Sequence, residues 1–242
     1  MKPELAVVAG ASGGLGRAFC ERIMARGSHA RVLALSRERP DGWEDDAKRG
    51  WARIDLLDED TLSAAAEAIA RQGEPSLIII ATGRLHRPGL TPEKSYRSIG
   101  LEALTELFAV NAAGPALLAK HLLPLTPVKS RSVFAALSAR VGSIGDNRLG
   151  GWHAYRASKA ALNMLLHTIA IEHRRLRPQG VCVALHPGTT DTELSKPFQA
   201  GVPPGKLFAP AQAADALLAV IDRLGPEDSG GFFAWDGSTI PW

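Results

Sequence analysis

Short apolar runs alternate with amphipathic stretches along the whole sequence. The apolar runs are continuous more often than alternating, which is typical of strands covered on both faces. They predict strands at residues 5–9, 31–35, 51–54, 77–81, 132–137, 181–186 and 231–234. The stretches between them have helical periodicity and predict helices at 14–26, 58–71, 101–123, 152–175 and 210–224.

This order of elements determines the expected fold. Strands that alternate with helices predict an α/β protein with a doubly wound parallel sheet of about seven strands and helices on both faces. No linker-like stretch divides the chain, so we expect a single domain over residues 1–242. The Pro- and Gly-rich segment 196–210 follows a predicted strand, and we interpret it as an irregular segment, either a lid over a substrate or a surface loop.

Composition and charge exclude several classes of function. The net charge of +3 reflects no strongly basic patch, so we expect no nucleic-acid partner. No apolar run approaches the ~20 residues of a membrane span, and the first strand begins too early to leave room for a signal peptide. Cys20 and Cys182 lie in predicted core elements and the histidines lack ligand spacing. We therefore expect no disulfide framework, no metal site and a cytoplasmic location.

A glycine-rich run follows the first predicted strand and opens the first predicted helix. Gly10, Gly14 and Gly16 form the pattern G-x-x-x-G-x-G. Glycine allows backbone N–H groups to approach a pyrophosphate without a β-carbon in the way, and the helix N-terminus favours the negative charge. Tight turns also use glycine for purely conformational reasons, but the position at the first strand–helix junction favours a dinucleotide site.

Tyr155 and Lys159 are four residues apart in a predicted helix and therefore share one face. An ammonium at ~4 Å contributes about 4 kcal/mol at an effective dielectric constant of ~20. That energy is sufficient to bring the pKa of a phenol from its ordinary value towards neutral pH, where it can exchange a proton. We expect Tyr155 to move a proton beside a cofactor that moves a hydride. A surface pair at helical spacing is the alternative.

With these motifs, the sequence resembles the short-chain dehydrogenase/reductase family from end to end. Three stretches, residues 138–147, 150–155 and 236–242, are similar to the C-factor-like and sniffer-like carbonyl reductase subgroup. The resemblance implies a Rossmann fold, with Tyr155 as the general acid/base and Lys159 on the nicotinamide ribose. It also implies that Asn111 anchors a proton-relaying water and that Thr192 holds the carboxamide.

The resemblance also implies a cofactor site. Its residues would be Gly10, Ser12, Gly13, Gly14, Leu15, Gly16, Ser36, Arg37, Asp55, Leu56, Ala81, Thr82, Gly83, Tyr155, Lys159, Pro187, Gly188, Thr189 and Thr192. Asp55 would hold the adenine amine. The family's Asn-Asn-Ala-Gly segment is replaced by Ala81-Thr82-Gly83, so contacts there would be made mainly by the backbone.

The catalytic serine of the family is displaced in this sequence. Counting back from Gly142, the expected position is Ala139, and Ser138 stands one residue earlier. Three alternatives remain: a bulged strand end turns Ser138 into the site, Ser143 substitutes, or the hydroxyl is missing. We favour Ser138. Loss of one donor to an oxyanion would lower the rate by ~10²–10³.

Ser36 and Arg37 end the second predicted strand, where a protein specific for NAD would carry an acidic residue. A guanidinium pairs with a 2′-phosphate, whereas a carboxylate would repel it. We therefore expect NADP(H) to be preferred over NAD(H), a solvent-exposed arginine being the alternative.

The expected function is NADP(H)-dependent interconversion of a small-molecule carbonyl and alcohol. The alternative is an NADP(H)-binding sensor or signalling protein with little turnover. By resemblance, helices 101–123 and 152–175 would pair across a twofold axis to give a homodimer or homotetramer.

Overall fold

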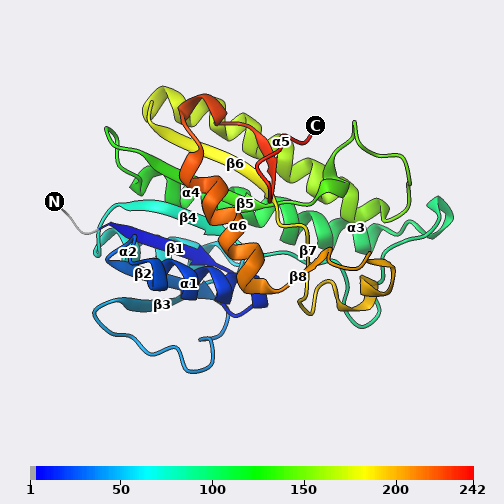
Figure 1. Cartoon of the computed structure of the whole chain (residues 1–242), viewed down its shortest axis with the longest axis horizontal. Coiled ribbons are helices and arrows are strands. Elements are labelled where there is room, and N and C mark those ends of the chain that lie inside the picture. Colours follow the sequence, from blue (N-terminus) through cyan, green and yellow to red (C-terminus); the bar gives the residue numbers. More distant parts are fainter. Residues whose placement is uncertain (1–3) are drawn as a thin grey trace.

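One parallel sheet of seven strands runs through the protein (Figure 1). The structure is a computed structural model that describes residues 4–242. The strand order is β3-β2-β1-β4-β5-β6-β9, and every neighbouring pair is parallel. These strands are β1 (Leu5–Ala9), β2 (Arg31–Ser36), β3 (Arg49–Arg53), β4 (Pro75–Ile80), β5 (Ser132–Leu137), β6 (Gly180–His186) and β9 (Phe232–Ala234).

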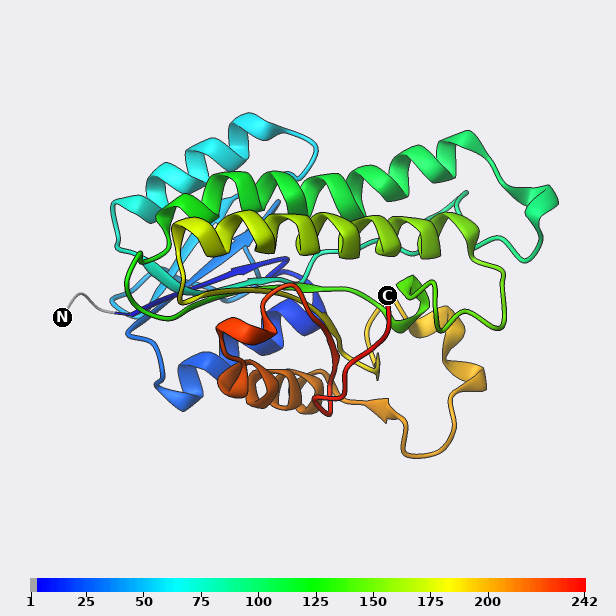
Figure 2. The same cartoon turned by 90° about the horizontal axis from the view of Figure 1, so that it is seen from above.

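Helices cover both faces of this sheet (Figure 2). The helices are α1 (Gly14–Arg26), α2 (Glu59–Ala70), α3 (Leu101–Phe108), α4 (Gly114–Leu122), α5 (His153–Leu176) and α6 (Pro210–Arg223). Buried side chains of α1 and α6 form one hydrophobic cluster with the sheet, and those of α2, α4 and α5 form another. The predicted doubly wound α/β architecture is confirmed.

The burial of the central strands on both faces explains why their sequences are continuously apolar. All five residues of β1 are buried. Its odd-numbered residues, such as Val7, belong to the cluster under α2, α4 and α5, whereas Ala6 and Val8 belong to the cluster under α1 and α6. Because side chains alternate between the faces of a strand, a sheet covered twice requires apolar residues at every position.

The strand order reverses between β1 and β4, which creates the switch point of the sheet. In open α/β sheets, ligands bind outside the carboxyl ends of the strands at such a point. The chain leaves this edge after Ala9, Ile80, Leu137 and His186. Apart from Asn111 and the α5 pair, the predicted site residues lie at or follow one of these strand ends or the end of a neighbouring strand.

The long helix expected at 101–123 is interrupted. A π-helical turn, Ala109–Ala113, separates α3 from α4, and a short 3₁₀ turn, Leu123–Leu125, follows α4. The apolar periodicity continues through the π turn, so the sequence pattern alone does not reveal the extra residue. Such turns are frequent at functional sites, and this one contains Asn111.

The segment at 196–210 is more ordered than predicted. Two-residue strands β7 (Thr189–Thr190) and β8 (Leu207–Phe208) pair in parallel and enclose a 3₁₀ turn, Lys196–Gly201. The expectation of an irregular segment is therefore wrong at 196–201, which form the 3₁₀ turn, and at 207–208, which pair with β7 through the main chain. The segment projects from the carboxyl edge of the sheet (Figure 1).

The run Leu101–Leu125 meets the length and hydropathy of a membrane-spanning helix, contrary to the expectation that no segment would. In the structure, Leu118 and Leu122 from this run pack into the core on the sheet. Within residues 4–242, no group of three or more His, Cys, Asp or Glu side chains could hold a metal ion. Both cysteines are free and buried, as predicted.

Candidate active site

The turn between β1 and α1 requires glycine at two positions. Gly10 adopts φ +86°, and a β-carbon there would lie 2.8 Å from the Ala81 carbonyl oxygen at the end of β4. A β-carbon on Gly16 would lie 2.1 Å from the Gly10 oxygen. No side chain caps the N-terminus of α1. Within residues 4–242, the N–H groups of Ser12, Gly14 and Leu15 are therefore available to a pyrophosphate, whereas that of Gly13 donates to the Gly10 carbonyl at 3.0 Å.

Ser36 and Arg37 lie at the end of β2, beside this turn. The Ser36 side chain is buried, where it donates to the Glu38 carbonyl at 2.5 Å and accepts from Trp51 Nε1 at 2.9 Å. Arg37 is exposed, and its guanidinium has no ion-pair partner within residues 4–242. Arg39, in contrast, pairs with an aspartate and lies over the ring of Trp51. Arg37 is thus free to bind an anion.

Asp55 and Leu56 follow β3 at the same edge. The Asp55 carboxylate accepts from the Leu57 N–H at 3.1 Å, and its side chain remains partly accessible. Leu56 lies against the N-terminus of α4, since a β-carbon on Gly114 would meet it at 2.7 Å. The structure thus places both residues near the ends of β2 and β3, where the resemblance puts the adenine.

Two buried hydroxyls near the carboxyl ends of the strands have no hydrogen-bond partner among residues 4–242. They are Thr82 Oγ1, after β4, and Thr190 Oγ1, in β7. A buried polar atom without a partner is costly, so a ligand is a natural source of the missing hydrogen bonds. Together with the glycine turn, these orphan hydroxyls fit a bound dinucleotide. The sequence prediction included Thr82 but missed Thr190. The family resemblance implied the nearby Thr189 and Thr192, and nothing in the sequence singled out Thr190.

The chain after β6 closes over the glycine turn. Gly188 adopts φ +73° immediately after Pro187. A β-carbon on Gly14 would lie 3.1 Å from Cγ2 of Thr192, so that threonine sits over the start of α1. Its hydroxyl makes only a long contact, 3.5 Å to the Thr190 carbonyl. The side chain can therefore take another partner.

Tyr155 and Lys159 lie on the buried face of α5. The side chains are 6% and 3% exposed, and Nζ of Lys159 lies 6.0 Å from the centre of the Tyr155 ring. Nζ donates to the Leu137 carbonyl at the end of β5, at 2.9 Å. A β-carbon on Gly83 would lie 3.5 Å from the same Nζ. The ammonium therefore faces the carboxyl ends of β4 and β5.

Burial changes the titration of both groups. It lowers the pKa of Lys159 to about 8 and raises the pKa of the Tyr155 hydroxyl. The expectation that Lys159 would lower the pKa of Tyr155 is thus wrong for the protein groups alone. The ammonium lies beside the ring and bonds to a carbonyl, whereas desolvation disfavours the charged form of both side chains.

Asn111 is fully buried in the π-helical turn. Its Oδ1 accepts from the Arg84 N–H at 2.7 Å, and its Nδ2 donates to the Arg84 carbonyl at 2.8 Å and to Ser158 Oγ at 3.0 Å. Ser158 in turn donates to the Tyr155 carbonyl at 2.8 Å. Asn111 thus connects the chain after β4 to the part of α5 that carries Tyr155.

The structure does not bring the predicted serine to Tyr155. Ser138 is buried, and its hydroxyl donates to Asn163 Oδ1 at 2.6 Å. Ser143 donates instead to the Pro241 carbonyl and accepts from the Asp146 N–H at 3.0 Å. Ala139 packs in the same cluster as Tyr155. Since successive residues of an extended chain point to opposite sides, the methyl group of Ala139 occupies the site wall and Ser138 faces away.

The same cluster forms an aromatic and apolar wall. Trp152, in the left-handed conformation at φ 53°, lies 6.2 Å from the Tyr155 ring and 4.9 Å from the ring of Phe198, centre to centre. Phe198 belongs to the 3₁₀ turn between β7 and β8. Leu85 and Leu194 complete this wall. The β7–β8 segment therefore contributes directly to the surroundings of Tyr155.

Comparisons with known proteins agree with this geometry. The family model described as short chain dehydrogenase matches residues 4–202. A 1-hydroxy-2-glutathionyl-2-methyl-3-butene dehydrogenase of a Rhodococcus species is 31% identical over 192 residues, 78% of each chain. The C-signal protein of Myxococcus xanthus is 39% identical over 140 residues, covering 57% of this chain and 78% of that one.

Solved structures have the same fold. NADPH-bound carbonyl reductase from chicken fatty liver has a TM-score of 0.84 at 23% identity, with both chains fully covered. The carbonyl reductase Sniffer of Drosophila melanogaster has a TM-score of 0.83 at 21% identity, with 99% of each chain covered. The expected resemblance to the family is confirmed, and the similarity to C-signal agrees with its C-factor-like branch. The chain belongs to the short chain dehydrogenase family of oxidoreductases.

Proposed function

We propose that the protein is an NADP(H)-dependent oxidoreductase that interconverts a carbonyl and an alcohol of a small molecule. The observation that carries the proposal is the burial of Tyr155 and Lys159 together at the carboxyl edge of the sheet. Burying a lysine without a carboxylate partner costs stability. Such an arrangement is characteristic of a functional site.

In the proposed reaction, the cofactor and the side chains of the site would each supply a separate part of the chemistry. NADPH, when bound, would supply the hydride. Tyr155 would donate its hydroxyl proton to the carbonyl oxygen as negative charge develops there. Its raised pKa keeps this proton in place at neutral pH, which suits the reductive direction. Lys159 would stabilise the resulting phenolate. The side chain of Asn111 would hold the chain after β4 next to Lys159.

The preference for NADPH over NADH rests on Arg37. This guanidinium is exposed beside the glycine turn and has no ion-pair partner in the described part of the chain. It would pair with the 2′-phosphate. Gly10, Gly14 and Gly16 would hold the pyrophosphate through the main chain, and Thr82 and Thr190 would supply hydroxyls.

The proposal is tested by following the loss of reduced cofactor with a panel of aldehydes, ketones and quinones, each with NADPH and with NADH. We expect turnover with NADPH for at least one class. In Tyr155→Phe, turnover should fall by ~10³ or more while NADPH binding is retained. No turnover of any compound by the wild-type protein would contradict the proposal.

A second candidate function is an NADP(H)-binding signalling protein with little turnover. Ala139 at the wall beside Tyr155 favours it, because the hydroxyl expected there is missing. The similarity to a protein called C-signal points the same way. If a cellular role survives Tyr155→Phe while reductase activity is lost, binding is the function.

We also propose a cytoplasmic homodimer or homotetramer formed through α3 and α5. Leu101 on α3 and Met164 and Ile171 on α5 are 80%, 66% and 51% exposed. Light scattering after size exclusion should give a dimer or tetramer. Ile171→Asp should shift the measured molecular mass towards that of a monomer. A monomeric wild-type protein would contradict this assembly.

A further inference from the structure

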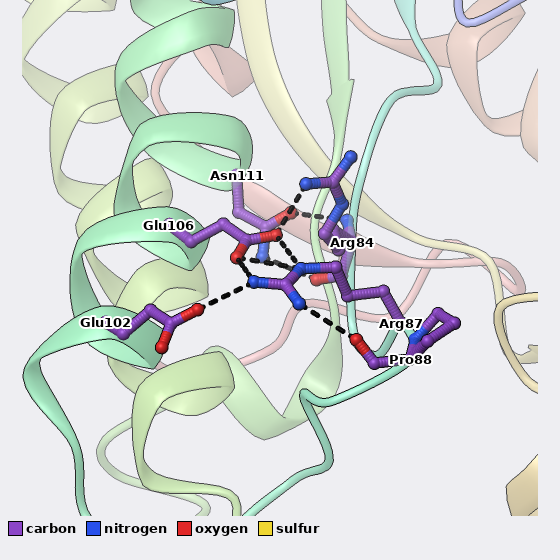
Figure 3. Close-up of polar contacts among 6 residues, drawn as sticks. All are labelled: Arg84, Arg87, Pro88, Glu102, Glu106 and Asn111. Atoms are coloured by element: carbon purple, nitrogen blue, oxygen red, sulfur yellow. Dashed lines mark hydrogen bonds and ion pairs between the residues drawn. The ribbon is translucent and has the colours of Figure 1, made fainter.

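Glu106 of α3 lies between two arginines of the loop that joins β4 to α3 (Figure 3). It accepts from Arg84 Nη1 at 2.6 Å and from Arg87 Nε and Nη2 at 2.6–3.0 Å. Its side chain is 16% exposed. The hydrogen bonds from Arg87, with those from Arg84, lower the pKa of the Glu106 carboxyl to about 2. The carboxylate is therefore charged at neutral pH.

Arg84 is held at two points by one helical run. Its guanidinium is bound by Glu106, and its main-chain N–H and carbonyl are bound by the side chain of Asn111. Figure 3 shows both sets of contacts meeting at this residue. Glu106 and Asn111 lie on either side of the start of the π turn. The loop can therefore move away from Asn111 only if the ion pair also breaks.

This double attachment borders the candidate active site. Gly83 precedes Arg84, and a β-carbon on it would lie 3.5 Å from Lys159 Nζ and 3.6 Å from Asn111 Oδ1. Asn111 also bonds to Ser158, which bonds to the Tyr155 carbonyl. A displacement of Arg84 would thus reach both Gly83 and the helix that carries Tyr155.

We propose that Glu106 is a positioning residue: through Arg84 and Arg87 it fixes the loop after β4, so that Asn111 and Gly83 keep their places beside Lys159. The inference rests on the proposed oxidoreductase function. It assigns no contact between Glu106 and substrate or cofactor. Displacements of about 1 Å in a catalytic arrangement lower rates by up to ~10², which gives the ion pair a measurable effect on turnover.

The test compares Glu106→Gln with Glu102→Gln. Glu102 lies one turn earlier on α3, is 83% exposed and pairs with Arg87 alone. For each protein, NADPH affinity is measured by fluorescence titration, and kcat and KM are measured with a carbonyl that the wild type reduces. We expect Glu106→Gln to lower kcat by ~10-fold or more, with a smaller change in KM. Glu102→Gln should stay within about twofold of wild type.

Arg84→Lys and Arg84→Met provide an independent comparison, because they leave Glu106 paired with Arg87. Retention of charge in Arg84→Lys should preserve more of kcat than Arg84→Met. If both Glu106→Gln and Arg84→Met match Glu102→Gln in kcat and NADPH affinity, the positioning role is overturned. Failure of the wild type to bind NADPH would instead overturn the proposed function.

Discussion

The glycine turn after β1 and the face of α5 that carries Tyr155 lie at the same edge of the sheet, but they are built differently. The turn would act through main-chain N–H groups, and its requirement is that Gly10 and Gly16 carry no side chain. The face of α5 would act through the side chains of Tyr155 and Lys159. A site made of main-chain groups tolerates substitutions around it. A site made of side chains changes its chemistry when one residue is replaced, as Ala139 at the position of the expected serine illustrates.

The largest expected effect is on the glycine turn. In Gly16→Ala, the added β-carbon would lie 2.1 Å from the Gly10 oxygen, so the turn must shift. We expect NADPH affinity to fall by ~10² or more, as loss of several main-chain bonds implies. Gly27→Ala is the control: φ is +62° with open space around it, and it should cost about 1–2 kcal/mol of stability without weakening NADPH binding. Equal NADPH affinities in the two variants would refute a main-chain site.

The next effect is a gain of activity on the catalytic face. Ala139→Ser would place a hydroxyl in the wall that contains Tyr155, where it could donate to the developing oxyanion. We expect kcat for carbonyl reduction to rise by ~10–10². Ser138→Ala should lower stability by about 1 kcal/mol, because its buried bond to Asn163 is lost, and should leave kcat nearly unchanged. A large loss of kcat in Ser138→Ala would restore Ser138 as the catalytic hydroxyl.

A smaller effect concerns cofactor choice. Arg37→Gln should reduce the ratio of kcat/KM with NADPH to that with NADH by about tenfold, since one charge-assisted contact with the 2′-phosphate is lost. Arg39→Gln is the matched control because Arg39 already pairs with Asp45. The two variants are compared by cofactor titration at fixed carbonyl concentration. Similar ratios in both would show that Arg37 does not select the cofactor.

The smallest effect is a dependence on pH. Burial lowers the pKa of Lys159 to about 8, so its amine loses the positive charge as the pH rises through that value. The positive charge is present at pH values below this pKa. We therefore expect NADPH affinity to decrease severalfold between pH 7 and 9. Lys159→Met should bind more weakly and without this dependence. A flat profile in the wild type would contradict this prediction, because NADPH affinity is independent of pH only if Lys159 is equally protonated in the free and the bound protein.

Sequence reasoning captured the features that repeat along the chain. Continuous apolar strands and helical periodicity gave the sheet and its two helix layers, because both depend on local pattern and burial. The π turn at Asn111 escaped this reasoning, since one extra residue hardly changes the apolar pattern. The orientation of Ser138 depends on the backbone after β5, and the contact of Arg84 with Glu106 joins residues 22 apart. Neither is encoded in spacing alone.

The π-helical turn also constrains how this chain can vary in length. A π turn accommodates one extra residue, so deleting one residue between 109 and 113 would restore regular α-helical hydrogen bonding and leave the helix after it in nearly the same rotational register. Leu118 and Leu122 would therefore keep their places on the sheet. The extra residue therefore sets the local position of Asn111: its removal would change the contacts of that side chain with Arg84 and Ser158, while the packing of α4 on the sheet is kept.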